Sequence, residues 1–187
     1  MSIIDGIDFG PLSHLVGAWS GNQGTDIAPE PDGDENNPYN ERIEFSVVGD
    51  VTNAEEQTLA VLFYRQIVRR ESNNAVFHDQ TGYCMWDATR KTVMHGFTIP
   101  RGVAVLAGGQ FNGDADAENL VLELSADSES PEFGIVQSPF MRDKAKTTAF
   151  SQKLVLQGNT LDYSQTTTLD IYGKVFAHTD ENRLVKI

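Results

Sequence analysis

The run L-D-Y-S-Q-T-T-T-L-D-I-Y-G-K-V-F-A-H-T-D-E-N-R-L-V-K-I at 161–187 predicts a hairpin around which the rest of the chain can be organised. Its first half is rich in Thr, Tyr and Leu, with apolar or aromatic residues at every second position until Gly173 interrupts the pattern. In the strand that follows, a two-residue period puts Lys174, Phe176 and His178 on one face. His178 is therefore predicted to point inward, although a lone strand histidine is more often structural than functional.

The composition indicates one acidic domain. The chain has 187 residues, of which 40% are hydrophobic, so we expect a single domain over residues 1–187 with a sizeable core. A net charge of −13 repels phosphate backbones and anionic lipid surfaces, so neither nucleic acid nor a membrane is expected as a partner. The single cysteine, Cys84, excludes an intrachain disulfide and a cysteine-based zinc cluster. The sequence has no signal-peptide pattern and no long apolar run, which favours a cytoplasmic setting.

Most of the remaining chain has the pattern of short strands between turn signals. Ile43, Phe45 and Val47 alternate with polar residues, and 57–70 predicts a longer strand. Further strands are predicted after the turns at Asn73-Asn74, Ala88-Thr89-Arg90-Lys91, Pro100-Arg101-Gly102, 112–119 and Gly158-Asn159. Stretches of about 8–14 residues between turns predict an all-β fold, an antiparallel up-and-down barrel of about ten strands of the lipocalin-like kind.

Three segments depart from the strand pattern. Residues 9–16 predict a short helix, and Trp19 after it is expected to fill one end of the barrel with its indole N–H bonded to a backbone carbonyl. Residues 26–40 hold three prolines and five acids without periodicity, which predicts a solvated surface loop rather than a calcium site. The irregular segment 126–146 is interpreted either as a flap over one mouth of the barrel or as a packed crossover.

The histidines are the main candidates for chemistry. A barrel of about ten strands can hold a small molecule. The chain has no nucleophile-elbow pattern and no phosphate-binding loop, and its four histidines lack the spacing of a local metal site. The sequence leaves undecided whether the fold brings these histidines together into a metal site. A single inward histidine in an apolar cup suits an axial ligand to haem iron.

Several motifs, in this order and spacing, resemble one known family. They are Gly17-x-Trp19-x-Gly21, Tyr39-x-Glu41-x-Ile43-x-Phe45, Phe77-His78-x-x-Thr81-Gly82-Tyr83, Pro100-x-Gly102-Val103, and Leu161-x-Tyr163 leading to His178. From about Leu12 to Ile187 the chain is similar to the nitrobindin-type haem-binding β-barrels, which are related in fold to fatty-acid-binding proteins and lipocalins.

The resemblance implies a cofactor and a ligand. In that family a last-strand histidine is the proximal ligand of haem b, and His178 matches it as the metal ligand; His78 matches a histidine near the haem. Ferric members of the family bind NO and isomerise peroxynitrite to nitrate. The chain departs from the family at Gln23-Gly24, at Arg101 and in the length of 126–146, all of which affect the pocket mouth.

Two other functions stay open. A metal-free barrel could bind a fatty acid or another apolar molecule, with Arg65, Arg69 and Tyr163 as carboxylate partners, although the pattern favours a solvent-facing position for the two arginines. A purely structural or partner-binding barrel without either ligand is the remaining alternative, and a homodimer of this chain is left open as a separate question.

Overall fold

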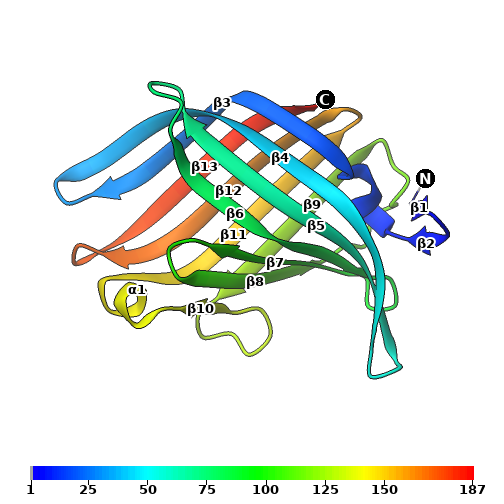
Figure 1. Cartoon of the computed structure of the whole chain (residues 1–187). Helices are drawn as coiled ribbons and strands as arrows, with labels where there is room; N and C mark the ends of the chain where they lie inside the picture. Colours follow the sequence, from blue (N-terminus) through cyan, green and yellow to red (C-terminus); the bar gives the residue numbers. More distant parts are fainter. Residues whose placement is uncertain (1) are drawn as a thin grey trace.

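The computed structural model describes residues 2–187 and shows a β-barrel with very little helix (Figure 1). Its short elements are β1 (Ile3–Ile4), β2 (Ile7–Asp8), the 3-10 helix η1 (Gly10–His14), β10 (Ile135–Gln137) and helix α1 (Pro139–Lys144). Its long strands are β3 (Gly17–Glu30), β4 (Gly33–Asn53), β5 (Gln57–Arg70), β6 (Val76–Asp87), β7 (Thr92–Ile99), β8 (Val103–Gln110), β9 (Asn119–Asp127), β11 (Ala145–Gln157), β12 (Thr160–Ile171) and β13 (Lys174–Lys186).

The ten long strands close into the antiparallel barrel that the turn spacing predicts. Their order is β8-β7-β6-β5-β4-β3-β13-β12-β11-β9, and Gly108 of β8 pairs with Ser125 of β9 to complete the circle. Pairing of β13 with β3 joins the two ends of the chain. Because almost every strand pairs with its neighbours in sequence, the topology is up-and-down, and closure leaves an interior that side chains or a ligand can fill.

Helix η1 and Trp19 close one end of the barrel, as predicted. Leu12, Leu15 and Trp19 are fully buried there. The indole N–H of Trp19 donates to the carbonyl of Leu15 at 2.7 Å, so the large ring is buried without an unpaired polar atom. The ammonium of Lys186 lies 5.1 Å from the centre of the indole ring.

The predicted surface loop at 26–40 is wrong. Strands β3 and β4 run through it, and only residues 31–32 form the turn between them. Pro29 pairs with Asp34 of β4 but lies beyond the last residue of β3 that pairs with β13, so its missing N–H costs no ladder bond to β13. The alternation was hidden because the inward side chains of β4 include the buried Tyr39 and Glu41, which do not stand out as apolar positions.

Of the two alternatives for segment 126–146, a flap or a packed crossover, the structure shows the packed crossover. Its strand β10 pairs with β8 from Val103 to Val105, where β8 has diverged from β9. The backbone N–H of Ser138, which also caps α1, donates to the carbonyl of Gly102 at 2.8 Å. The segment therefore completes the barrel wall instead of lying free over the mouth.

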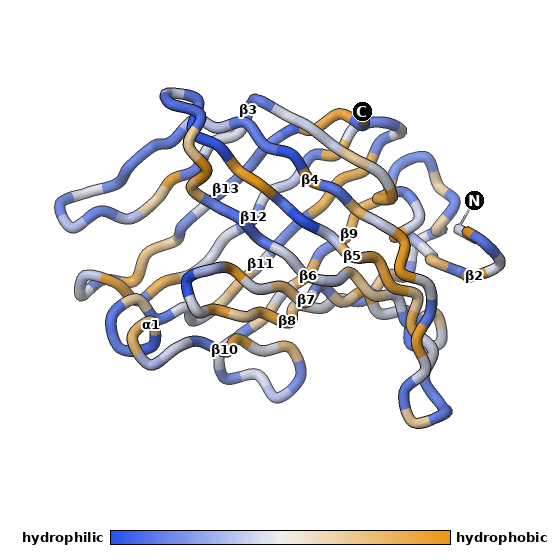
Figure 2. The backbone as a smooth tube through the Cα atoms, in the orientation of Figure 1, coloured by the Kyte–Doolittle hydropathy of each residue, from blue (hydrophilic) through white to orange (hydrophobic). Residues whose placement is uncertain are grey.

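The interior has an apolar half next to η1 and a polar half beyond it. Buried apolar side chains near η1 include Ile43, Leu62, Trp86, Leu122, Leu156 and Leu184. Buried polar side chains include Asp26, Asn37, Glu41, Gln66, Gln80, Gln152 and Asn182. Figure 2 shows the β3–β4 hairpin as mostly hydrophilic.

Across residues 2–187, no helix has the length and apolar character required to cross a bilayer.

Candidate functional site

Strand β13 carries His178 into the polar half of the barrel. Exposure alternates along this strand, so Phe176 and His178 are less exposed than Val175 and Ala177, and the predicted inward orientation is confirmed. Thr167 of β12 lies opposite His178 in the ladder. The His178 side chain keeps 27% of its surface accessible. It therefore lies where solvent reaches the interior, far along β13 from the end that η1 closes.

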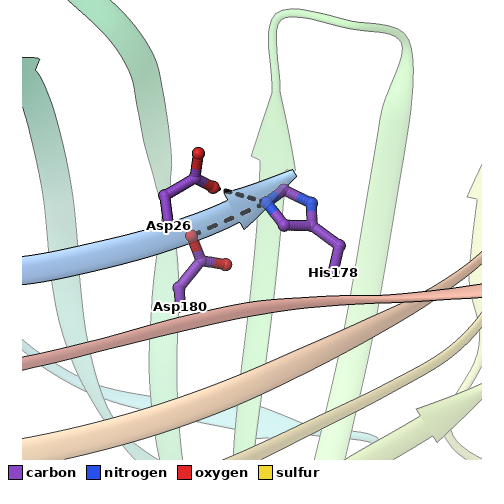
Figure 3. A group of neighbouring side chains, drawn as sticks. All are labelled: Asp26, His178 and Asp180. Carbon is purple, nitrogen blue, oxygen red and sulfur yellow. Dashed lines mark hydrogen bonds and ion pairs between the residues drawn. The ribbon is translucent and has the colours of Figure 1, made fainter. Parts of the chain in front are cut away.

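Two carboxylates flank the His178 ring (Figure 3). Its Nε2 atom lies 2.5 Å from Oδ1 of Asp26 and 3.7 Å from Oδ1 of Asp180. Asp26 belongs to β3 and Asp180 to β13, and the two residues are direct partners in the antiparallel ladder. Like charges opposite each other in a ladder are unfavourable, so this pair depends on the histidine beside it.

Side-chain amides hold the outer oxygen of each carboxylate. Asn37 donates to Oδ2 of Asp26 at 3.0 Å, and Gln165 donates to Oδ2 of Asp180 at 3.0 Å. Because both Oδ2 atoms are taken, both Oδ1 atoms are the ones turned toward the imidazole. The sequence reasoning missed both acids, although the two-residue spacing of His178 and Asp180 was a usable signal.

The three groups shift one another's protonation. Burial alone raises the pKa of Asp26, but hydrogen bonds from His178 and other partners outweigh burial and lower it overall. Burial lowers the pKa of His178, yet the hydrogen bond to Asp26 and the charge of Asp180 raise it overall. Burial raises the pKa of Asp180. The site therefore holds a charged His178–Asp26 pair beside the carboxyl group of Asp180, which keeps its proton to a higher pH than usual.

His78 lies on β6 in the same electrostatic environment. One of its ring nitrogens, Nε2, is 3.1 Å from Oε1 of Gln80. Burial lowers the pKa of His78, and the positive charges of Arg101 and His178 lower it further. The structure thus brings the two predicted histidines within electrostatic range of each other, without a direct contact between them.

His95 is a buried histidine that the sequence reasoning did not single out. Its Nδ1 lies 3.1 Å from Oε1 of Gln152, and its Nε2 is buried without a hydrogen-bond partner. The ring packs against Tyr64 and Phe97, with centroids 4.6 and 4.9 Å away. It lines a cavity of about 30 Å³ in the apolar half. Burial lowers its pKa to about 4, so the ring is neutral at pH 7.

A second polar cluster lies around Glu41 in the barrel interior. The carboxylate of Glu41 accepts from Gln66 and from Asn182, each at 2.7 Å. The hydroxyls of Tyr39 and Tyr163 lie 2.6 Å apart beside it. Burial raises the pKa of Glu41. Tyr163 therefore faces inward, as the carboxylate-binding alternative requires, but its hydroxyl is already bonded within this cluster.

The two arginines of that alternative face away from the interior. Arg65 forms two hydrogen bonds with Asp79 on the outer surface, the shorter at 2.7 Å. Arg69 donates to the carbonyl of Asn74 at an exposed position. The solvent-facing interpretation is confirmed for this pair. A buried arginine anchor for a fatty-acid carboxylate is therefore not formed by Arg65 or Arg69.

Comparison with known proteins agrees with this architecture. Residues 8–186 match the family model described as the THAP4-like, heme-binding beta-barrel domain. The chain belongs to this family. The crystal structure of Rv2717c from M. tuberculosis superposes with a TM-score of 0.69 at 21% sequence identity, covering 94% of each chain, which shows a shared fold. A search of curated proteins found no match.

The donor atoms around His178 are compatible with an axial haem ligand. The Nε2–H of His178 donates to Asp26, whereas no group within residues 2–187 bonds its Nδ1. Once the charged ring loses its Nδ1 proton, the Nδ1 lone pair would be the one available to iron, with Asp26 holding Nε2–H and so fixing the tautomer. A ligating histidine that donates its other N–H to a carboxylate is a common arrangement in metalloproteins. The residues present thus fit the family's cofactor at the open end.

Proposed function

We propose that this barrel binds haem b at its open end through His178 and acts on small reactive nitrogen species. Membership of a haem-binding barrel family supports the cofactor. The observation that carries the choice of ligand is the inward, partly accessible His178 ring with one nitrogen held by Asp26 and the other unbonded. When bound, ferric haem supplies the chemistry toward NO and peroxynitrite.

The residues around the proposed haem site have different parts in this proposal. His178 holds the cofactor, and Asp26 orients the ring and makes it more basic. His78, neutral because burial and nearby positive charge lower its pKa, offers a hydrogen-bond partner to a small molecule. The apolar residues Phe97 and Phe150 are buried in the barrel and limit the access of water. The protein thereby orients and shields the group that does the chemistry.

Titration of the apo-protein with hemin tests this proposal. Wild-type protein is expected to give a sharp Soret band at one equivalent, and His178→Ala is expected to lose it. His14→Ala is the matched control, since His14 is the last residue of η1, bonds the carbonyl of Ala115 and lies outside the proposed site. A Soret band that survives unchanged in His178→Ala removes His178 as the ligand.

The reaction is tested separately from the binding. Addition of NO to the ferric protein is expected to shift the Soret band, and peroxynitrite decay is expected to accelerate only with haem-loaded protein. His78→Ala is expected to retain haem but to change the affinity for NO. Haem binding without any effect on NO or peroxynitrite would keep the cofactor and discard the proposed reaction.

A further inference from the structure

The turn between β7 and β8 carries Arg101 at the open end of the barrel. Figure 1 shows this turn at the opposite end of the molecule from η1. The ladder between β6 and β7 ends where Thr81 lies opposite Thr98. Three residues further on, the same antiparallel register puts Arg101 level with His78. Arg101 therefore lies beside the strand that carries one of the two histidines of the candidate site.

Backbone hydrogen bonds fix the position of this turn. The N–H of Arg101 donates to the carbonyl of Ile99 at 2.7 Å, and the N–H of Ser138 donates to the carbonyl of Gly102 at 2.8 Å. Gly102 has a φ of +73°, which glycine adopts without strain. The Arg101 residue itself is exposed. A fixed backbone thus holds a long side chain that solvent reaches.

Within residues 2–187, Arg101 is the one arginine whose side chain has no hydrogen bond or ion pair. Every other arginine in that range bonds a carboxylate or a backbone carbonyl. The chain holds 27 Asp and Glu residues against 14 Lys and Arg residues, so partners for a guanidinium are plentiful. The Arg101 guanidinium is therefore available to an anion that comes from outside the chain.

The charge of Arg101 reaches both histidines of the site. It lowers the pKa of His78 and opposes the rise in the pKa of His178. A cation in this place does not stabilise the site itself, because it disfavours the charged form of His178 and bonds neither Asp26 nor Asp180. An anion bound between the two histidines and Arg101 would offset that repulsion.

We propose that the guanidinium of Arg101 binds a propionate carboxylate of the porphyrin at the open end of the barrel. This inference rests on the proposed haem function. A chain with a net charge of −13 repels a ligand that carries two carboxylates, so a local cation is needed where they enter. The planar guanidinium can donate two parallel hydrogen bonds to one carboxylate. Arg101 thereby favours porphyrins with free carboxylates and helps to orient them in the mouth.

Titration with hemin, and separately with the dimethyl ester of hemin added from dimethyl sulfoxide, tests this role. Arg101→Gln is expected to weaken the binding of hemin about 5-fold and to leave the binding of the ester unchanged, because the ester has no charged carboxylate. Arg42→Gln is the matched control, since it removes the same charge from an exposed pair with Glu44. Circular dichroism checks that both variants keep the wild-type fold.

A second measurement uses the protein without haem. The pKa of His78, followed by NMR, is expected to rise in Arg101→Gln and to stay at the wild-type value in Arg42→Gln. An unchanged pKa in Arg101→Gln would place the guanidinium away from the site and overturn the inference.

The hemin titrations separate this inference from the haem proposal. If wild type binds hemin but Arg101→Gln and Arg42→Gln bind it equally well, the role of Arg101 is overturned and the haem proposal stands. An equal loss of affinity for hemin and for its ester in Arg101→Gln also overturns the carboxylate contact. Wild-type protein that binds no hemin would overturn both.

Discussion

The Nε2 atom of His178 lies 2.5 Å from Oδ1 of Asp26, although 152 residues separate them in the chain. Closure of the barrel between β3 and β13 creates this contact. It decides which nitrogen of the imidazole remains open and how readily the ring gives up its proton. The same contact lies at the centre of the haem proposal.

Removal of the Asp26 charge is expected to lower the pKa of His178. Burial disfavours the charged ring, and in the wild type this is outweighed by the hydrogen bond to Asp26 and by the negative charges of Asp26 and Asp180. In Asp26→Asn the ring should therefore titrate at a lower pH, as followed by NMR of its side-chain resonances. Asp79→Asn, which removes a carboxylate on the outer surface, should leave the titration unchanged. An equal or higher pKa in Asp26→Asn would contradict the assigned pairing.

Acid is expected to destabilise the fold partly through His95. Its pKa is about 4 in the folded protein, where burial disfavours the charged ring. An unfolded-state histidine titrates near 6.5, so below that pH the unfolded state binds more protons and stability falls until about pH 4. The full loss in the free energy of unfolding from this one group is on the order of 3 kcal/mol. Urea unfolding of wild type and of His95→Gln at pH 7 and pH 5 measures this loss. The free energy of unfolding is expected to fall less between the two pH values in the variant than in the wild type.

Truncation of Trp19 is expected to be among the costliest single changes. The ring is fully buried at the closed end and is hydrogen-bonded to Leu15. Trp19→Ala should lower the free energy of unfolding by about 3–5 kcal/mol, because it leaves a cavity beside η1 and an unpaired carbonyl. Val185→Ala, at a position 52% exposed, is the control and should change stability little. Similar unfolding midpoints for the two variants would show that Trp19 does not support the closed end.

Cys84 is expected to be inert in the folded protein. The thiol is buried inside the barrel, and burial raises its pKa to about 12, so almost none is thiolate at pH 7. A thiol reagent such as DTNB should react with the native protein only at the rate of opening, and rapidly in denaturant. Fast reaction of native protein would mean that the β6–β7 region opens readily.

Much of the fold follows from local pattern. Turn residues between short strands predicted the all-β class and about ten antiparallel strands, while the two-residue period of β13 predicted the inward direction of His178. Trp19 and the helix before it could be placed at one end because a large indole needs both burial and a hydrogen-bond acceptor. These are properties of short stretches, which depend on nearest neighbours in the chain.

The candidate site depended on tertiary structure. Asp26 stood in a proline-rich acidic run that predicted a solvated loop, because the inward face of that hairpin is polar and gives no hydrophobic alternation. Only closure of the barrel brings Asp26 into register with Asp180 and against His178. The two-residue period places His95 on one strand face with Val93 and Phe97, but its contact with Gln152 of β11 has no local signal. A sequence determines which face a side chain takes, whereas the partner across the barrel is set by how distant strands pair.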